Sequence, residues 1–300
     1  MDDFSHKAAF VTGGANGIGL GIARSLARAG VNVAIADIDE SSLADARAAV
    51  EPFGTKVMTI ALDVSDRAAV DRAADEVESA FGSVHLVFNN AGVSIGPLPV
   101  TDIAPQQWDW IFGVNVFGVV NGVSAFVPRI EAHGEGGHVV NTASIGGLQV
   151  HPVLRNGSYA MTKYAVVALS EALALQLEDT NIGVSVLCPA ATRSTLSRSS
   201  QRRPERFGGP YEPVVPAERR GSSLLPEALD PDDVGERVLD CIRHDEFFIF
   251  THSDPRVWIA ERNARLVGAF DSVDAYNTAH GRGPAGRRAP ARGRTTPPGT

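Results

Sequence analysis

The chain has 300 residues, of which 44% are apolar, and it carries a formal charge of −8. That length accommodates one large α/β domain or two smaller ones with a substantial core. The acidic balance gives no reason to expect nucleic acid as the main partner. Two cysteines, Cys188 and Cys241, are too few for a disulfide framework, which favours a reducing, cytoplasmic compartment.

The first ten residues, MDDFSHKAAF, are acidic where a secretion signal would be basic, and they contain no long apolar core. The most membrane-like stretch is 111–127, which is short for a membrane span and is interrupted by Asn115, Asn121 and Ser124. We therefore predict a buried helix there and expect no membrane as a partner.

Short β-branched runs alternate with helical patterns along the chain. The runs predicted as strands lie at 8–13, 31–37, 56–64, 84–90, 137–144, 183–189 and, at the sheet edge, 246–251. The predicted helices lie at 18–30, 41–53, 66–81, 105–134, 159–179 and 230–244. The strands are too apolar to be half exposed, which is typical of parallel strands covered by helices on both faces. The alternation predicts an α/β fold with a doubly wound, Rossmann-type, mostly parallel seven-stranded sheet.

Two regions depart from this alternation. Residues 190–230 are rich in Pro, Gly, Arg and Ser without a clear period, and we predict a substrate-binding loop there. Residues 281–300 contain five arginines, no acidic residue and almost nothing apolar, which predicts a disordered tail. We interpret the tail as a solvated extension, the alternative being contact with nucleic acid or a membrane. Residues 1–280 are expected to form a single domain.

The glycine-rich segment VTGGANGIGLG joins the first predicted strand to the first helix. Glycines let a backbone approach a ligand closely, and the start of a helix offers free N–H groups and a positive dipole end that suit a pyrophosphate. The literal G-x-G-x-x-G pattern is absent, and tight strand–helix packing is the alternative explanation. The position between a strand and a helix favours a dinucleotide site.

The second predicted strand ends at Asp37, about 20 residues after Gly17, which is the interval typical of the acid that binds a dinucleotide ribose. A carboxylate there accepts hydrogen bonds from both ribose hydroxyls and repels a 2′-phosphate. Its sequence neighbours offer no compensating cation, since Ile38 follows it and Asn16 occupies the glycine turn. These residues predict NAD rather than NADP, the alternative being an acid that caps the next turn.

A tyrosine and a lysine stand four residues apart in SYAMTK (158–163), at the start of an apolar helix. Side chains at i and i+4 share one helix face, and a nearby cation stabilises a phenolate over a phenol. Taken alone, such a pair is more simply a surface contact.

Six motifs in order make the chain resemble the classical short-chain dehydrogenases/reductases over about residues 5–255. The motifs are TGGANGIG (12–19), DV (63–64), NNAG (89–92), VNVFG (114–118), Ser144 and YAMTK (159–163). The resemblance implies a dehydrogenase with Tyr159 as the general acid/base and Lys163 as the residue that lowers the phenol pKa and binds the nicotinamide ribose. It also implies that Ser144 holds the substrate oxygen and that Asn115 holds a water linking Lys163 to solvent.

The same resemblance implies a cofactor-binding set. Its members are Gly13, Asn16, Gly17, Ile18, Gly19, Asp37, Ile38, Asp63, Val64, Asn89, Asn90, Ala91, Gly92, Tyr159, Lys163, Pro189, Thr192 and Ser194.

The chain departs from the family pattern at three places. Ser144 and Tyr159 are two residues further apart than is common, which alters the rim of the pocket. Pro189-Ala190 replaces the usual Pro-Gly, which asks Ala190 to adopt the backbone shape of a glycine. The family's nearby threonine is matched by Ser194, with Thr192 and Thr195 as possible substitutes.

The expected substrate pocket is bounded by residues 93–99, 145–157 and 190–230. Its candidate lining residues are mostly apolar or aromatic: Ile95, Ile145, His151, Leu196, Phe207 and Tyr211. Local strings such as GHVVNTASIGG and RFGGPYEP resemble bacterial aryl-ether Cα-dehydrogenases, which oxidise bulky benzylic alcohols to ketones. We therefore expect a small-molecule partner, a secondary alcohol or ketone on a bulky aromatic or cyclic framework.

Two other functions compete with this one. An acyl- or polyketide-type ketoreductase would prefer a phosphorylated cofactor, against which Asp37 argues. A non-catalytic NAD-binding sensor would tolerate loss of Ser144, Tyr159 or Lys163, and all three are present. The helices at 105–132 and 159–179 are apolar around much of their surface, so a homodimer or homotetramer is expected.

Overall fold

The computed structural model describes residues 3–150, 156–212 and 227–282, and these residues divide into two compact units at Pro255/Arg256. Most of the tail predicted at 281–300 lies outside the described residues, as do His151 and residues 213–226 of the predicted substrate loop. The expected single domain over 1–280 stays a prediction.

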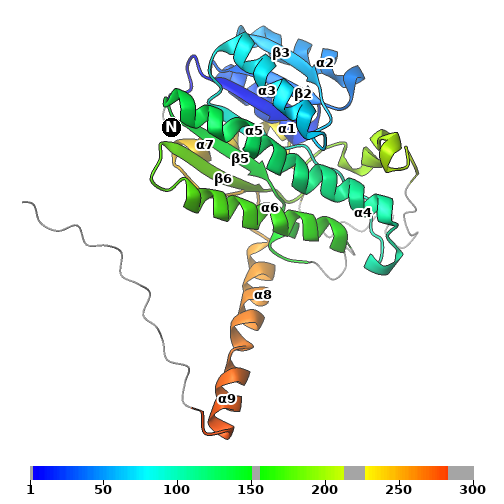
Figure 1. Ribbon diagram of the computed structural model, residues 1–300, viewed down its shortest axis with the longest axis vertical. Coiled ribbons are helices and arrows are strands. Elements are labelled where there is room, and N and C mark those ends of the chain that lie inside the picture. Colours follow the sequence, from blue (N-terminus) through cyan, green and yellow to red (C-terminus); the bar gives the residue numbers. More distant parts are fainter. Residues whose placement is uncertain (1–2, 151–155, 213–226, 283–300) are drawn as a thin grey trace, which may run out of the picture. The chain divides into compact units, whose positions relative to one another are not determined.

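The first unit is built on one seven-stranded sheet (Figure 1). Its strands are β1 (Ala8–Thr12), β2 (Asn32–Asp37), β3 (Val57–Ala61), β4 (Leu86–Asn89), β5 (Gly137–Thr142), β6 (Ile182–Cys188) and β7 (Phe248–Phe250). They are hydrogen-bonded in the order β3-β2-β1-β4-β5-β6-β7, and every neighbouring pair is parallel. The predicted fold is thus confirmed, with a sheet that is wholly parallel. The strand order reverses between β1 and β4, where α/β proteins of this type bind ligands.

Helices cover both faces of the sheet, as the apolar strands predict (Figure 1). The helices are α1 (Gly17–Arg28), α2 (Glu40–Val50), α3 (Arg67–Phe81), α4 (Pro105–Phe112), α5 (Gly118–His133), α6 (Gly157–Gln176) and α7 (Pro231–Arg243). One core lies between the sheet and α1, α2 and α7, and the other lies under α3, α4, α5 and α6. Alternate residues of a strand enter opposite cores, so Val11 of β1 packs toward α1 whereas Phe10 stacks on Phe126 of α5 with ring centres 4.5 Å apart.

Two glycines let α1 and α7 approach closely. A Cβ atom added to Gly21 of α1 would lie 1.9 Å from the carbonyl oxygen of Pro231, and one added to Gly235 of α7 would lie 2.4 Å from the carbonyl oxygen of Gly21. Both distances are far below van der Waals contact, so this helix pair requires residues without a side chain at both positions.

The predicted buried helix at 111–127 lies within a continuous helical stretch, Pro105–His133, that comprises α4, the π-helical turn η3 (Gly113–Phe117) and α5. By length and composition alone this stretch would cross a membrane, but 61% of its most apolar window is buried inside the protein. It is a core helix, as the interrupting asparagines indicated.

Within its described residues, 256–282, the second unit contains two helices, α8 (Arg256–Gly268) and α9 (Asp271–Ala279), which are not among the predicted elements. Neither helix has a buried residue, and both expose apolar side chains such as Val267 and Val273.

Candidate active site

Residues at or just beyond the carboxyl ends of six strands line one cavity of about 360 Å³. Parallel strands place all their carboxyl ends at one edge of the sheet, so segments far apart in the sequence meet there. All but three of the predicted catalytic and cofactor-binding residues line this cavity; the exceptions are Gly19, Asn89 and Asn115.

The glycine turn has the backbone geometry that its sequence predicts. Gly13 and Gly17 have φ of +60° and +51°, a region that side chains disfavour. Helix α1 begins at Gly17 with no side-chain cap and no acidic residue in its first turn, so its first N–H groups and its dipole are not compensated by a side chain. Gly19 has another reason to be glycine, because a Cβ atom there would lie 2.2 Å from the carbonyl oxygen of Gly13.

Asp37 lies at the end of β2 and lines the cavity. Its Oδ2 accepts a hydrogen bond from the Ala15 N–H at 3.1 Å, and its Oδ1 accepts one from the Asp39 N–H at 3.1 Å. Burial raises the pKa of this carboxyl, and the two N–H groups oppose the rise. The sequence neighbours of Asp37 offer no cation, but the fold supplies one: Arg202 lines the same cavity and pairs with Asp39, which precedes it by 163 residues.

The two asparagines of the NNAG motif, Asn89 and Asn90, lie in different surroundings. Asn90 lines the cavity, and its Nδ2 donates to the carbonyl oxygens of Thr12 and Gly13, which ties the end of β4 to the glycine turn. Asn89 was expected on the adenosine side, but it is buried beneath the cavity and donates from Nδ2 to Asn141 Oδ1 at 2.8 Å. Its side chain points from a strand into the core, so this expectation is corrected.

Ser144, Tyr159 and Lys163 open onto the cavity together. The Ser144 hydroxyl is hydrogen-bonded to the Tyr159 hydroxyl, so the two extra residues between them do not separate the pair. The Lys163 Nζ donates to the Thr142 carbonyl oxygen at 2.7 Å and lies 5.6 Å from the centre of the Tyr159 ring. Strand β5 and helix α6 therefore bring one hydroxyl, one phenol and one amine to a single place.

Burial dominates the protonation of this group. It raises the pKa of Tyr159 to about 12, against the lowering effect of the Ser144 hydrogen bond. It lowers the pKa of Lys163 to about 8. The shift of the phenol is opposite in direction to the one expected from the sequence, because removing a phenolate from water outweighs the lowering effect of the Ser144 hydrogen bond. The residues of the chain alone do not prepare Tyr159 as a base.

Asn115 lies behind the cavity in the π-helical turn η3 and is fully buried. Its Oδ1 accepts from the Val93 N–H at 2.7 Å, and its Nδ2 donates to the Val93 carbonyl oxygen and to Thr162 Oγ1, each at 3.0 Å. A Cβ atom added to Gly92 would lie 3.4 Å from Lys163 Nζ and 3.5 Å from Asn115 Oδ1, so both groups face the same small space.

The segment after β6 also differs in detail from expectation. Ala190 does not take a positive φ; in the described chain the non-glycine residues that do are His6 and Asp245. Its N–H donates to Thr251 Oγ1 at 3.1 Å. Thr192 Oγ1 is buried in the cavity wall and has no hydrogen-bond partner among the described residues, whereas Ser194 Oγ accepts from the Leu196 N–H at 3.4 Å.

The expected substrate-lining residues are only partly confirmed in position. Leu196 lines the cavity, Ile95 is buried in the core, and Ile145, Phe207 and Tyr211 are not in the cavity lining. Trp110 and Val114 line it instead. They stand one helical turn apart just before Asn115, and this i, i+4 spacing beside a family motif is the signal that would have found them.

Residues 7–205 match the short chain dehydrogenase family.

The chain belongs to the short-chain dehydrogenase family.

Membership confirms the prediction of an oxidoreductase of the dehydrogenase type. The chain is 36% identical over 278 residues to the C alpha-dehydrogenase of Sphingobium sp. strain SYK-6, which covers 92% of this chain and 90% of that protein. It is 31% identical over 269 residues to a 1-deoxy-11-beta-hydroxypentalenate dehydrogenase of Streptomyces exfoliatus. That alignment covers 89% of this chain and 88% of the Streptomyces protein. Among solved structures, a short-chain dehydrogenase/reductase from Burkholderia phymatum in complex with NAD has a TM-score of 0.80 and 32% identity, covering 96% of this chain and all of that one.

The cavity fits a dinucleotide of the kind bound in that structure. The uncapped start of α1 suits a pyrophosphate, Asp37 suits a ribose diol, and the unpartnered Thr192 hydroxyl suits a carboxamide. Gly92 leaves room beside Lys163 that a side chain would fill. We therefore regard these residues as the ones that would hold the cofactor.

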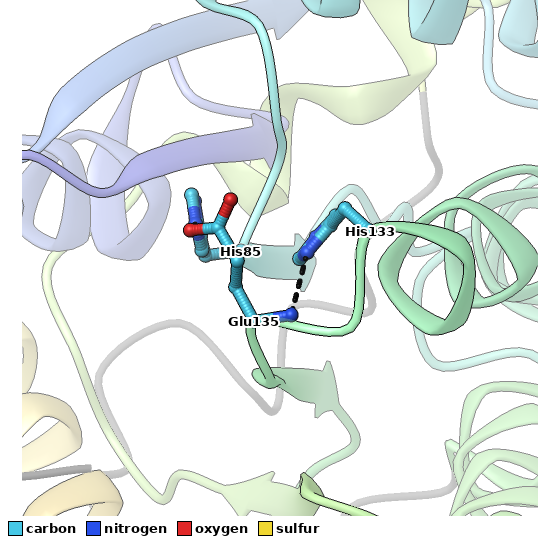
Figure 2. Close-up of side chains that lie close together, drawn as sticks. All are labelled: His85, His133 and Glu135. Atoms are coloured by element: carbon cyan, nitrogen blue, oxygen red, sulfur yellow. Dashed lines mark hydrogen bonds and ion pairs between the residues drawn. The ribbon is translucent and has the colours of Figure 1, made fainter.

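A second group of titratable side chains lies at the opposite edge of the sheet, where strands begin (Figure 2). His85 precedes β4, and Glu135 lies in the loop between His133 and β5. His85 Nδ1 accepts from the Ala8 N–H, so its Nε2 carries the proton and donates to Glu135 Oε2 at 2.9 Å. His133 Nδ1 accepts from the Glu135 N–H, and its Nε2 donates to the Val84 carbonyl oxygen. These bonds occupy every ring nitrogen, so we assign the group a structural role.

Proposed function

We propose that the protein is an NAD-dependent oxidoreductase that interconverts a secondary alcohol and a ketone on a bulky aromatic or cyclic substrate. One observation carries the proposal: Ser144, Tyr159 and Lys163 open onto the same cavity as the glycine turn and Asp37. A hydrogen-bonded hydroxyl and phenol beside a dinucleotide site form an acid/base pair for a substrate oxygen.

NAD, when bound, supplies a hydride acceptor. During alcohol oxidation the Tyr159 oxygen takes the proton of the substrate hydroxyl, and Ser144 donates a hydrogen bond that orients the substrate oxygen. Asn115 acts through its bonds to Val93 and Thr162, which hold the backbone beside Lys163.

The electrostatic demand on this site is large. A pKa of about 12 must fall by about 5 units for Tyr159 to act as a base near pH 7, which is about 7 kcal/mol. One unit charge about 4 Å away contributes on the order of 4 kcal/mol at an effective dielectric constant of 20. The pKa of about 12 is that of the chain with Lys163 already in place, so the positive ring of an oxidised nicotinamide is the additional cation, and it would supply more than half of the demand.

Asp37 supports NAD over NADP, because a half-buried carboxylate beside the ribose repels a 2′-phosphate. Trp110, Val114 and Leu196 give the other end of the cavity an apolar wall. That wall favours a hydrophobic alcohol, and the two relatives named above are both dehydrogenases. Asp37 disfavours the ketoreductase alternative, and the contact between Ser144 and Tyr159 disfavours a non-catalytic sensor.

The experiment is to follow NADH formation with three matched sets of secondary alcohols: benzylic, fused-ring and straight-chain. We expect turnover with NAD, a weaker rate with NADP, and at least about a tenfold higher kcat/KM for the ring-containing sets. NADH binding without turnover on any set would favour the sensor, and a preference for NADP would defeat the argument from Asp37.

A further inference from the structure

Arg202 reaches the adenosine end of the cavity from a distant part of the chain. It is the last residue of the 3₁₀ segment η5 (Leu196–Arg202), and it lines the cavity together with Asp37 and Ile38. Its Nε donates to Asp39 Oδ2 at 2.8 Å, and its Nη1 donates to Thr195 Oγ1 at 3.4 Å.

Asp39 is built to hold that guanidinium. Its side chain is only 15% exposed, and it accepts hydrogen bonds from the Ser41 hydroxyl at 2.6 Å and the Ser42 hydroxyl at 2.8 Å in addition to Arg202. Three donors on one carboxylate stabilise its charged form, and a partly buried charge pair is less screened than an exposed one.

A second ion pair fixes the same segment. Arg206, in η6 (Glu205–Phe207), donates from Nη2 to Asp63 Oδ2 and to Ser65 Oγ at 2.6 Å. The arginine-bearing segment is thus tied to the cavity rim at Asp39 and again at Asp63, so Arg202 stands at a defined place.

We propose that Arg202 is a specificity-determining residue for the dinucleotide, and that Asp39 holds it away from a cofactor 2′-phosphate. The inference rests on the proposed function, because it concerns the preference for NAD over NADP. A guanidinium presents a fork of donors that matches a phosphate, and beside Asp37 it would offset the repulsion of the carboxylate. This end of the cavity carries the negative charges of Asp37 and Asp39 and the positive charge of Arg202. While Asp39 accepts a hydrogen bond from Arg202, the guanidinium is held at Asp39.

The test measures dissociation constants of NADH and NADPH by cofactor fluorescence, without any substrate. The variants are Asp39→Asn, Asp39→Ala, Arg202→Ala and the double variant Asp39→Asn/Arg202→Ala. Arg198→Ala is the matched control, since Arg198 belongs to the same segment, is exposed and is not in the cavity lining.

We expect Asp39→Asn and Asp39→Ala to tighten NADPH binding by about tenfold or more, which is about 1.4 kcal/mol, while NADH binding changes by less than about threefold. The double variant should lose the gain, and Arg198→Ala should match the wild type for both cofactors. Circular dichroism verifies that each variant is folded.

A gain in NADPH affinity that persists in the double variant would overturn the role of Arg202, as would no gain in either Asp39 variant. If the wild-type chain binds neither cofactor, the proposed function fails and the inference falls with it. If NADH binds and the Asp39 variants leave NADPH unchanged, the inference alone fails.

Discussion

Burial keeps Tyr159 in its protonated form, although the Ser144 hydroxyl opposes this effect. Burial raises its pKa to about 12, the Ser144 hydroxyl is its hydrogen-bond partner, and the Lys163 ammonium is directed at the Thr142 carbonyl oxygen. The proton of Tyr159 is consequently coupled to the charge of the cofactor. On the proposed function, Tyr159 would therefore act as a base only when an oxidised cofactor is in place.

Replacing Tyr159 by Phe removes the acid/base oxygen and leaves the ring in place. We expect kcat for alcohol oxidation to fall by about 10²- to 10⁴-fold, the usual contribution of a positioned acid or base, with little change in the dissociation constant of NADH. Steady-state rates and cofactor fluorescence measure the two quantities. Tyr164→Phe is the matched control, because Tyr164 is on the same helix and is not in the cavity lining. Equal losses in both variants would contradict the assignment.

His138 of β5 makes stability depend on pH. Burial lowers its pKa to about 4, and its Nε2 lies 2.8 Å from Ser185 Oγ. An unfolded histidine takes up a proton near pH 6.5, so the neutral ring stabilises the fold fully above that pH, and the contribution is lost as the pH falls from 6.5 to 4. The loss is up to about 3 kcal/mol in the free energy of unfolding. Urea unfolding at pH 7, 5.5 and 4.5 should show a shallower decline for His138→Gln; parallel declines would exclude His138 as the source.

Several residues were accessible from the sequence because short local patterns encode them. The glycine turn, Asp37 and the Tyr159–Lys163 pair each depend on spacing within one element or one connection. Arg202 was not accessible, since only the folded chain brings the end of η5 to the same cavity as Asp37. The direction of the Tyr159 pKa shift was also missed, because burial is a property of the packed molecule.

Among the elements, the contact between α1 and α7 shows the strictest steric demand. Gly21 and Gly235 allow backbone atoms of the two helices to approach to a distance that no side chain tolerates. The glycines at the start of α1 thus serve two purposes. Gly17 shapes the turn after β1, and Gly21 permits α1 to pack against α7. From the sequence, Gly13, Gly17 and Gly19 were assigned to the cofactor turn, with tight strand–helix packing as the alternative, and Gly21 was given no separate role.

Gly21→Ala tests this packing. Its Cβ would collide with backbone atoms of Pro231, which do not yield as a flexible side chain does, so we expect a loss of about 2–3 kcal/mol in the free energy of unfolding. Gly268→Ala is the control, because a Cβ there has nothing within 4 Å and alanine favours a helix. Chemical denaturation of both variants decides the matter, and an unchanged midpoint for Gly21→Ala would show that the helices separate easily.

The boundaries of the seven strands and of the helices from α1 to α7 were predicted to within about three residues, whereas α8 and α9 were not predicted. Buried parallel strands such as β1 and β2 have continuous apolar runs, which makes them conspicuous. Helices α8 and α9 have no buried face, so their sequences lack the apolar periodicity that predicts a helix.

At the scale of the whole molecule, the exposed large apolar side chains include one pair on α6 and one pair on β7. Met161 and Leu175 of α6 are 55% and 74% exposed, and Phe248 and Phe250 of β7 stack with ring centres 5.9 Å apart on the edge strand. Exposed apolar groups that recur along one helix or one edge strand favour association of subunits. This accords with the homodimer or homotetramer expected from the sequence.

Leu175→Glu tests the assembly. We expect the wild type to sediment as a dimer or tetramer and the variant to shift toward a smaller species, because a buried, unpaired carboxylate opposes the contact. Analytical ultracentrifugation at several concentrations measures the shift. Phe53→Glu is the control, since Phe53 is an exposed aromatic on the connection after α2. A monomeric wild type would contradict the expectation.

Because the seven strands all run in the same direction, their carboxyl ends and their amino ends lie on opposite sides of the sheet and hold two different groups of residues. The reactive cavity lies at the carboxyl ends, and the bonded group of His85, His133 and Glu135 lies at the amino ends. Glu135 is half exposed there. A dye or a solid support coupled at position 135 through an introduced thiol would thus leave the reactive edge facing the solution, which gives a practical handle for immobilising the enzyme in working order.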